Sequence, residues 1–217
     1  MAQLGQLRKV LWTDIDAAYE GDPAAVSYEE IISSYPGLEA IAIQRMTRLD
    51  ENRARAQLAH KAGVSIRSVT NMTIWGNHSS TQYPDFYNAR IDGRPANEVI
   101  EDEKWLKGDF IAAVQQRGAA VIKARGLSSA GSAANAVIDT VVSLTTDTPA
   151  NDWHSVAVFS DGSYAVEKGL ISSFPVRVRG GKWEIVQGLP INDFSRSKID
   201  ASVAELREEK SLVSELL

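Results

Sequence analysis

Cysteine is absent from this 217-residue sequence, and histidine is scarce. Without cysteine the chain can form no disulfide, no thiolate nucleophile and no cysteine-ligated metal centre. Its three histidines, His60, His78 and His154, stand far apart along the chain, which is not the spacing of a histidine metal site. The composition therefore predicts no metal and leaves oxygen and nitrogen side chains as the candidates for chemistry.

The sequence also lacks a block of basic residues and a long hydrophobic run. Its formal net charge is −5 and its pI is about 5.3, so it has no electrostatic footprint for nucleic acid or an anionic membrane surface. No run approaches the roughly 18 apolar residues of a membrane span, and acidic residues interrupt the N-terminal segment where a signal peptide is apolar. We therefore expect a cytoplasmic protein with no nucleic-acid or membrane partner.

What the sequence does contain is a mixture of helical and strand patterns. Apolar residues recur at helical spacing over 103–126, with a break near Gly118, over 130–147 after a serine cap, and over 193–217 after an aspartate or serine cap. Strand patterns follow one another over 153–188, with Gly180-Gly181 as a hairpin turn. These patterns predict an α/β chain of mixed α+β order rather than regular βαβ alternation.

Two patterns near the middle of the chain surround a candidate site. Residues 50–63 are expected to form a helix with Asp50 in its first turn and Gly63 as its stop. Residues 69–77 are expected to form a strand that delivers His78 to its C-terminal end, and a further strand is expected over 86–92.

His78 and the pair of Asp50 and Arg53 are the candidates for chemistry. Asp50 and Arg53 are three positions apart in the expected helix, where such a pair is most often a solvated ion pair. A lone histidine at a strand end is likewise more often structural than functional. If the three gather, however, the aspartate can orient the imidazole for proton exchange while the arginine binds a carboxylate. The pattern leaves both interpretations open, and the second one fits chemistry on a 2-hydroxy or 2-oxo acid.

Four longer stretches carry a resemblance to a known family. They are TRLDENRARAQLA, IWGNHSSTQYPD, WLKGDFIAAVQQRGAAVIKARGLSSAGSAANA and SFPVRVRGGKWEIVQGLPINDFSRSKID. In this order they closely resemble the C-terminal half of malate dehydrogenases of the cytosolic and bacterial dimeric type, over about residues 47–217. The resemblance implies a lactate/malate dehydrogenase C-terminal-like domain that interconverts malate and oxaloacetate with NAD, and it allows a homodimer.

The same resemblance implies roles for individual residues. His78 in GNHSS matches the family's proton acceptor and donor, and Asp50 in RLDENR matches its carboxylate partner. Arg53 in the same motif matches the arginine that binds the C1 carboxylate of the substrate. Ser129, the second serine of GLSSA, matches a position that lines the substrate and nicotinamide end of the pocket.

The nucleotide-binding Rossmann domain of that family has no counterpart in this sequence. A dinucleotide-binding fold needs a glycine-rich turn between a strand and a helix, whereas the glycines before Asp50 (Gly5, Gly21 and Gly37) follow no expected strand. The family's mobile loop with two arginines is also missing. The NAD-binding residues therefore stay unknown, and we expect this chain alone to be weakly active or inactive.

Residues 1–46 are expected to form a helical segment of their own. Its DPAA and YPGLEAIAIQRM motifs resemble the N-terminal helical region of bacterial serine acetyltransferases, over about residues 7–46. That family's catalytic hexapeptide repeat is absent, so the resemblance implies a packing or oligomerisation segment without acetyltransferase activity. Because both parts resemble partial enzymes, one hypothesis is a composite sequence. The alternative function is a non-catalytic module that oligomerises or associates with a complete dehydrogenase.

Overall fold

A computed structural model describes residues 36–127 and 130–212. The chain divides into two compact units, Met1–Gln44 and Arg45–Leu217, and nearly all of the described residues belong to the second. The helical segment expected over 1–46 lies outside the described residues up to position 35, and residues 36–46 are helical. The segment's boundary and its resemblance to serine acetyltransferases stay predictions.

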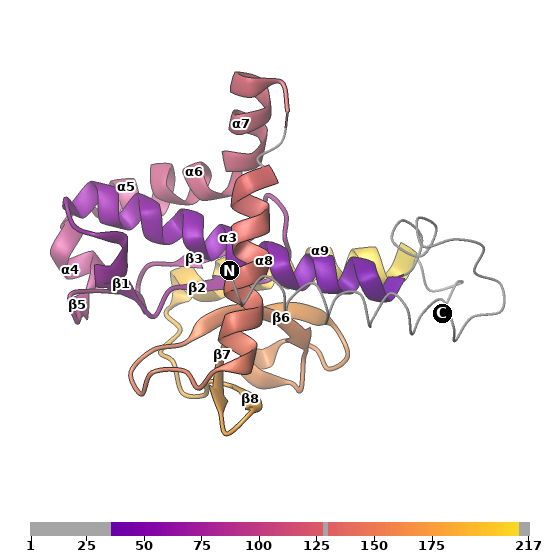
Figure 1. Ribbon diagram of the computed structural model, residues 1–217. Helices are drawn as coiled ribbons and strands as arrows, with labels where there is room; N and C mark the ends of the chain where they lie inside the picture. The colour runs from indigo at the N-terminus through magenta and orange to yellow at the C-terminus, as the bar shows by residue number, and fades with distance from the viewer. Residues whose placement is uncertain (1–35, 128–129, 213–217) are drawn as a thin grey trace, which may run out of the picture. The chain divides into compact units, whose positions relative to one another are not determined.

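The largest sheet lies in the C-terminal part of the second unit and has three antiparallel strands (Figure 1). These are β6 (His154–Phe159), β7 (Ile171–Arg179) and β8 (Lys182–Ile185). Val156 pairs with Phe174 across the first two strands, and Val178 pairs with Trp183 across the last two. Gly180 and Gly181 connect β7 to β8 with positive φ angles of 55° and 75°, which confirms the predicted hairpin turn.

Five short strands form two smaller antiparallel sheets. One sheet contains β1 (Val69–Thr70), β4 (Arg90–Ile91) and β5 (Arg94–Pro95), and the other contains β2 (Thr73–Trp75) and β3 (Tyr83–Asp85). The prediction of one continuous strand over 69–77 is therefore wrong. Asn71 has a φ of 57° between β1 and β2, a conformation that asparagine tolerates, so the chain leaves one sheet and enters the next. The strand predicted over 86–92 is also mostly turn.

The sheets are accompanied by helices, of which α7 (Arg117–Arg125) projects away from them (Figure 1). The helices are α3 (Pro36–Ala62), α4 (Ala96–Ile100), α5 (Glu103–Trp105), the π-helical η2 (Leu106–Phe110), α6 (Ile111–Gln115), α7, α8 (Ala130–Thr145) and α9 (Asp193–Leu212), with the 3₁₀ turns η1 (Ile66–Ser68) and η3 (Ser163–Ala165). The break predicted near Gly118 is confirmed between α6 and α7. No helix in the described part of the chain is both long enough and apolar enough to cross a membrane.

One predicted helix start and one predicted helix cap are wrong. α3 begins well before Asp50, which therefore lies in the interior of the helix rather than in its first turn, although Gly63 follows the helix end as predicted. α9 begins at Asp193, but the side chain that caps it is Asn192, whose Oδ1 accepts a hydrogen bond from the backbone N–H of Ser195.

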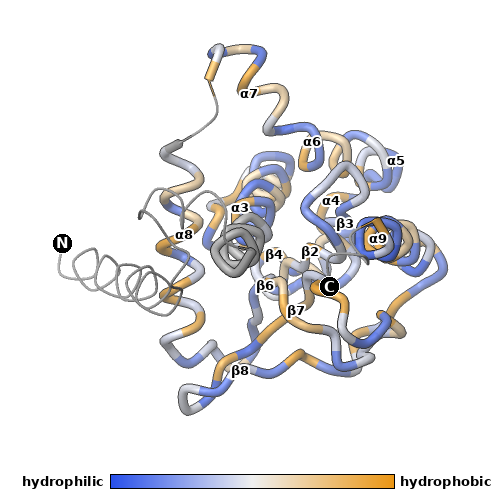
Figure 2. Tube along the Cα trace, turned by 90° about the vertical axis from the view of Figure 1, so that its right-hand side faces the viewer, coloured by the Kyte–Doolittle hydropathy of each residue, from blue (hydrophilic) through white to orange (hydrophobic). Residues whose placement is uncertain are grey.

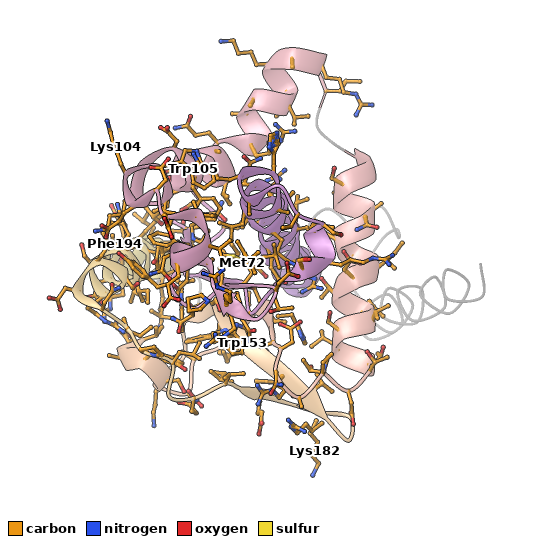
Figure 3. The ribbon with its side chains drawn as sticks, turned by 90° about the vertical axis from the view of Figure 1, so that its left-hand side faces the viewer. Met72, Lys104, Trp105, Trp153, Lys182 and Phe194 are labelled. Carbon is orange, nitrogen blue, oxygen red and sulfur yellow. The ribbon has the colours of Figure 1, made fainter. Side chains whose placement is uncertain are left out.

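The core is built mainly from aromatic and branched side chains. The ring of Trp75 packs edge-on against Tyr164 and Phe174, with centroid distances of 4.8 and 6.2 Å. α9, seen nearly end-on in Figure 2, contributes Ile199 and Val203 to this core. Its buried residues recur at helical spacing and so lie on one face of the helix: Ser195, Ile199, Ser202 and Val203. The predicted amphipathic helix is thereby confirmed. Figure 3 shows charged Lys104 and Lys182 projecting outward from this body.

Candidate active site

β2 delivers His78 to the edge of the core. After Trp75 the chain turns at Gly76, whose φ is 88°, and Gly76 bridges to Ser173 of β7 through two backbone hydrogen bonds of 3.3 and 2.9 Å. Asn77 and His78 follow directly. The predicted placement of His78 just beyond a strand end is confirmed. The bridge between Gly76 and Ser173 holds the backbone just before His78 in place.

α3 supplies the partner of His78. Nδ1 of His78 lies 2.5 Å from Oδ2 of Asp50, 28 positions earlier in the sequence. The side chain of Asp50 is fully buried, whereas that of His78 is 25% exposed. In the part of the chain that the structure describes, no hydrogen bond is found at Nε2 of His78, so this nitrogen is available to a ligand.

Arg53 completes the group from the same helix. Its Nη1 donates to Oδ1 of Asp50 at 3.0 Å, so the two carboxylate oxygens of Asp50 serve the arginine and the imidazole separately. The predicted i,i+3 ion pair is present, but its carboxylate is buried rather than solvated. A buried carboxylate needs such partners because an unpaired buried charge is costly, and the pairing also holds both partners in place.

Arg53 also lines a cavity of about 480 Å³ between helices. α3, α6, α7 and α8 supply its walls: Leu49, Asn52, Arg53, Ala56, Gln57, Ala113, Arg117, Val121, Gly131, Ser132 and Asn135. Two arginines, several amides and no carboxylate line this space, which favours a small anion. Ser129, the fourth predicted site residue, lies outside the described residues, although Gly131 and Ser132 nearby in sequence line the cavity.

Sequence reasoning missed the residues that join α8 to α3 at this cavity. Asp139 accepts hydrogen bonds at Oδ2 from Asn52 at 2.6 Å and from Asn135 at 2.8 Å. Asn135 and Asp139 are four positions apart, a helical spacing that the sequence does show. Asn52 is 87 positions from Asp139, and no local pattern predicts that contact.

The other two histidines lie away from this group. His60 is exposed near the end of α3. His154 is 4% exposed, and its Nε2 has no hydrogen-bond partner among the described residues. Burial, and then the positive charge of Arg48, lower the pKa of His154 to about 4. His154 is therefore neutral in the folded protein at pH 7.

The low pKa of His154 predicts a loss of stability in acid. Between about pH 6.5 and pH 4 the unfolded chain binds a proton at this histidine and the folded chain does not, so the stability present above pH 6.5 falls as the pH drops. The loss from this group amounts to roughly 2–3 kcal/mol of unfolding free energy. We expect His154→Gln to flatten this part of the pH profile in urea unfolding.

His60→Gln is the matched control for this experiment, because His60 is exposed. It should leave the pH profile of the unfolding free energy unchanged. A profile equally steep in His154→Gln would show that other groups cause the acid loss.

The described residues contain no group of three or more His, Cys, Asp and Glu side chains that could hold a metal ion. They also do not fit a dinucleotide. The strand pairs among them are antiparallel, so this part of the chain offers no parallel strand leading through a glycine-rich turn into a helix that could bind a pyrophosphate.

Comparison with known proteins places the chain in a family. Residues 47–217 match the lactate/malate dehydrogenase α/β C-terminal domain. Malate dehydrogenase from Naegleria fowleri is similar to 79% of the chain, with 48% identity and a TM-score of 0.74, and lactate dehydrogenase from Trichomonas vaginalis is similar to 77% of it, with 28% identity and a TM-score of 0.71. The match spans 52% of each of these proteins, about half their length. The chain therefore belongs to the lactate/malate dehydrogenase family, and its residues 47–217 correspond to the α/β C-terminal domain of that family.

Proposed function

We propose that this chain is the substrate-binding and proton-transferring domain of an NAD-dependent oxidoreductase that interconverts malate and oxaloacetate. The observation that carries this proposal is the group of His78, Asp50 and Arg53, in which one buried carboxylate holds both an imidazole and an arginine. Of the three residues, Arg53 lines the cavity that favours a small anion. The 48% identity to a malate dehydrogenase supports malate rather than lactate as the substrate.

In this proposal Arg53 binds a carboxylate of the substrate. A guanidinium carries five N–H donors. In Arg53 one of them, on Nη1, donates to Asp50, and the others have no hydrogen-bond partner among the described residues. The remaining donors can grip a carboxylate with two parallel hydrogen bonds, which orients the adjacent carbon as well as holding the charge. Arg53 lines the cavity and is 15% exposed, so a ligand can reach it.

His78 exchanges the proton. The hydrogen bond to Asp50 favours the proton on Nδ1, which leaves Nε2 as the base that takes the proton of the substrate hydroxyl during oxidation. In the reverse direction the same nitrogen returns the proton to the carbonyl oxygen. The negative charge of Asp50 stabilises the imidazolium that exists between these events, because it lies buried and close to the ring.

The assignment of NAD as the cofactor rests on a relative and not on the described residues of this chain. The lactate dehydrogenase from Trichomonas vaginalis was solved in complex with NADH and oxamate. Since the described residues of this chain do not fit a dinucleotide, we expect weak turnover from the chain alone, and binding of the substrate is the more direct test.

We expect Arg53→Gln to weaken oxaloacetate binding by roughly 10- to 100-fold, the range for losing a charge-assisted pair of hydrogen bonds. Isothermal titration calorimetry on the purified chain measures the dissociation constant. Arg55→Gln is the matched control, because Arg55 lies on the same helix and pairs with Glu51 but does not line the cavity. Equal weakening in both variants, or no binding to the unaltered chain, would contradict the role of Arg53.

A further inference from the structure

The segment that carries His78, residues 77–81, is hydrogen-bonded to the C-terminal helix α9. The backbone N–H of Asn77 donates to Oγ of Ser202 at 2.8 Å, and the same Oγ lies within hydrogen-bond distance, 3.0 Å, of Oγ1 of Thr81. Ser202 is fully buried on the face of α9 that packs against the core. The segment 77–81 therefore lies along α9 rather than being free in solvent.

One carboxylate of α9, that of Glu205, accepts hydrogen bonds from three of the five side chains of segment 77–81. Oε2 of Glu205 accepts hydrogen bonds from Oγ of Ser79 at 2.5 Å, from Oγ1 of Thr81 at 2.5 Å and from Nδ2 of Asn77 at 3.3 Å. Burial by itself would raise the pKa of Glu205, but these hydrogen bonds outweigh it and hold the pKa below its usual range. Glu205 is therefore ionised at neutral pH and accepts charge-assisted hydrogen bonds.

The chain of contacts continues from Glu205 to His78. Nδ2 of Asn77 is held by Glu205 and, at 2.8 Å, by Oε1 of Glu209. Oδ1 on the other side of the same planar amide accepts the backbone N–H of His78 at 2.8 Å. The backbone of His78 is thereby oriented from α9, while its ring is oriented from α3 by Asp50.

We propose that Glu205 is a positioning residue for His78, fixing the 77–81 segment so that the imidazole meets Asp50 on one side and presents Nε2 to the ligand on the other. Its functional meaning rests on the proposed role of His78 in proton transfer. Positioning of this kind matters because a shift of about 1 Å in a reacting group can cost about 100-fold in rate.

The test compares Glu205→Ala with Glu208→Ala in the full chain. Glu208 lies on the same helix and is exposed, and its carboxylate has no hydrogen-bond or ion-pair partner among the described residues. Because each variant replaces a glutamate of α9 by alanine, both change helix propensity alike. Two readouts are taken by NMR: amide hydrogen exchange, and the downfield Nδ1–H proton of His78 in its bond to Asp50. Glu205→Gln, which keeps the side-chain shape, serves if the alanine variant does not fold.

In Glu205→Ala we expect exchange of the His78 and Thr81 amides to accelerate by at least roughly tenfold and the Nδ1–H signal of His78 to broaden. Exchange at Val156, a buried residue of β6, should stay unchanged, as should all readouts in Glu208→Ala. Parallel acceleration at Val156 would assign Glu205 a merely global structural role and overturn the proposal, as would an unchanged His78 signal. Neither readout requires turnover or oxaloacetate binding, so a failure here is distinguishable from a failure of the proposed function.

Discussion

Gly76→Ala is expected to lower the unfolding free energy by roughly 3–5 kcal/mol, the sum of backbone strain at positive φ and a severe overlap in the core. A Cβ at position 76 would lie 2.0 Å from Oγ and 2.4 Å from Cβ of Ser202, and φ of Gly76 is 88°. Ser202 is fully buried on α9, so it cannot move aside cheaply. Urea unfolding followed by circular dichroism measures the loss.

Gly93→Ala separates the two causes of this loss. Gly93 has a similar φ of 79°, but no atom lies within 4 Å of the Cβ that alanine would add there. We expect it to cost only about 1–2 kcal/mol, the price of the left-handed conformation alone. Combining Gly76→Ala with Ser202→Gly should recover part of the loss, because the overlapping atoms are removed. Equal losses in Gly76→Ala and Gly93→Ala would show that close packing against Ser202 is unimportant.

His78→Gln is expected to reduce NADH-dependent turnover of oxaloacetate by about 100- to 10,000-fold in kcat, with a smaller change in KM. Glutamine can still accept a hydrogen bond but cannot exchange a proton at neutral pH, so the variant removes acid–base chemistry while Arg53 keeps its contact with Asp50. Absorbance of NADH at high protein concentration, corrected for the buffer reaction, measures the rate.

His60→Gln is the matched control, because His60 lies exposed on α3, away from Asp50. It should retain the full rate. Undiminished turnover in His78→Gln would remove this residue from the mechanism. No turnover above the buffer reaction in the unaltered, folded chain would contradict an activity of the chain by itself and favour the alternative of a non-catalytic module.

The architecture was largely predictable where it depends on neighbours in sequence. The break near Gly118, the hairpin at Gly180-Gly181 and the amphipathic terminal helix were all confirmed. The errors concern sites where distant segments intervene. Asn71 splits an expected strand while its backbone N–H donates to Asp152, 81 positions away. Asp50 indicates a helix start by its residue type, but α3 begins at Pro36, and Asp50 instead pairs with His78, 28 positions away.

The sequence by itself determined the helix and strand periods, the i,i+3 placement of Asp50 and Arg53, and the resemblance to the family, because these depend on local spacing and on residue order. Only the tertiary structure decided that Asp50 is buried, that it reaches His78 across 28 positions, and that Glu205 holds the segment carrying that histidine. The physical reason is that such contacts depend on how helices and sheets pack. In the packed protein a buried charge finds its partner, and Gly76 meets Ser202, on segments far apart in the sequence. Contacts between such distant positions leave no periodic pattern in the sequence from which they could be predicted.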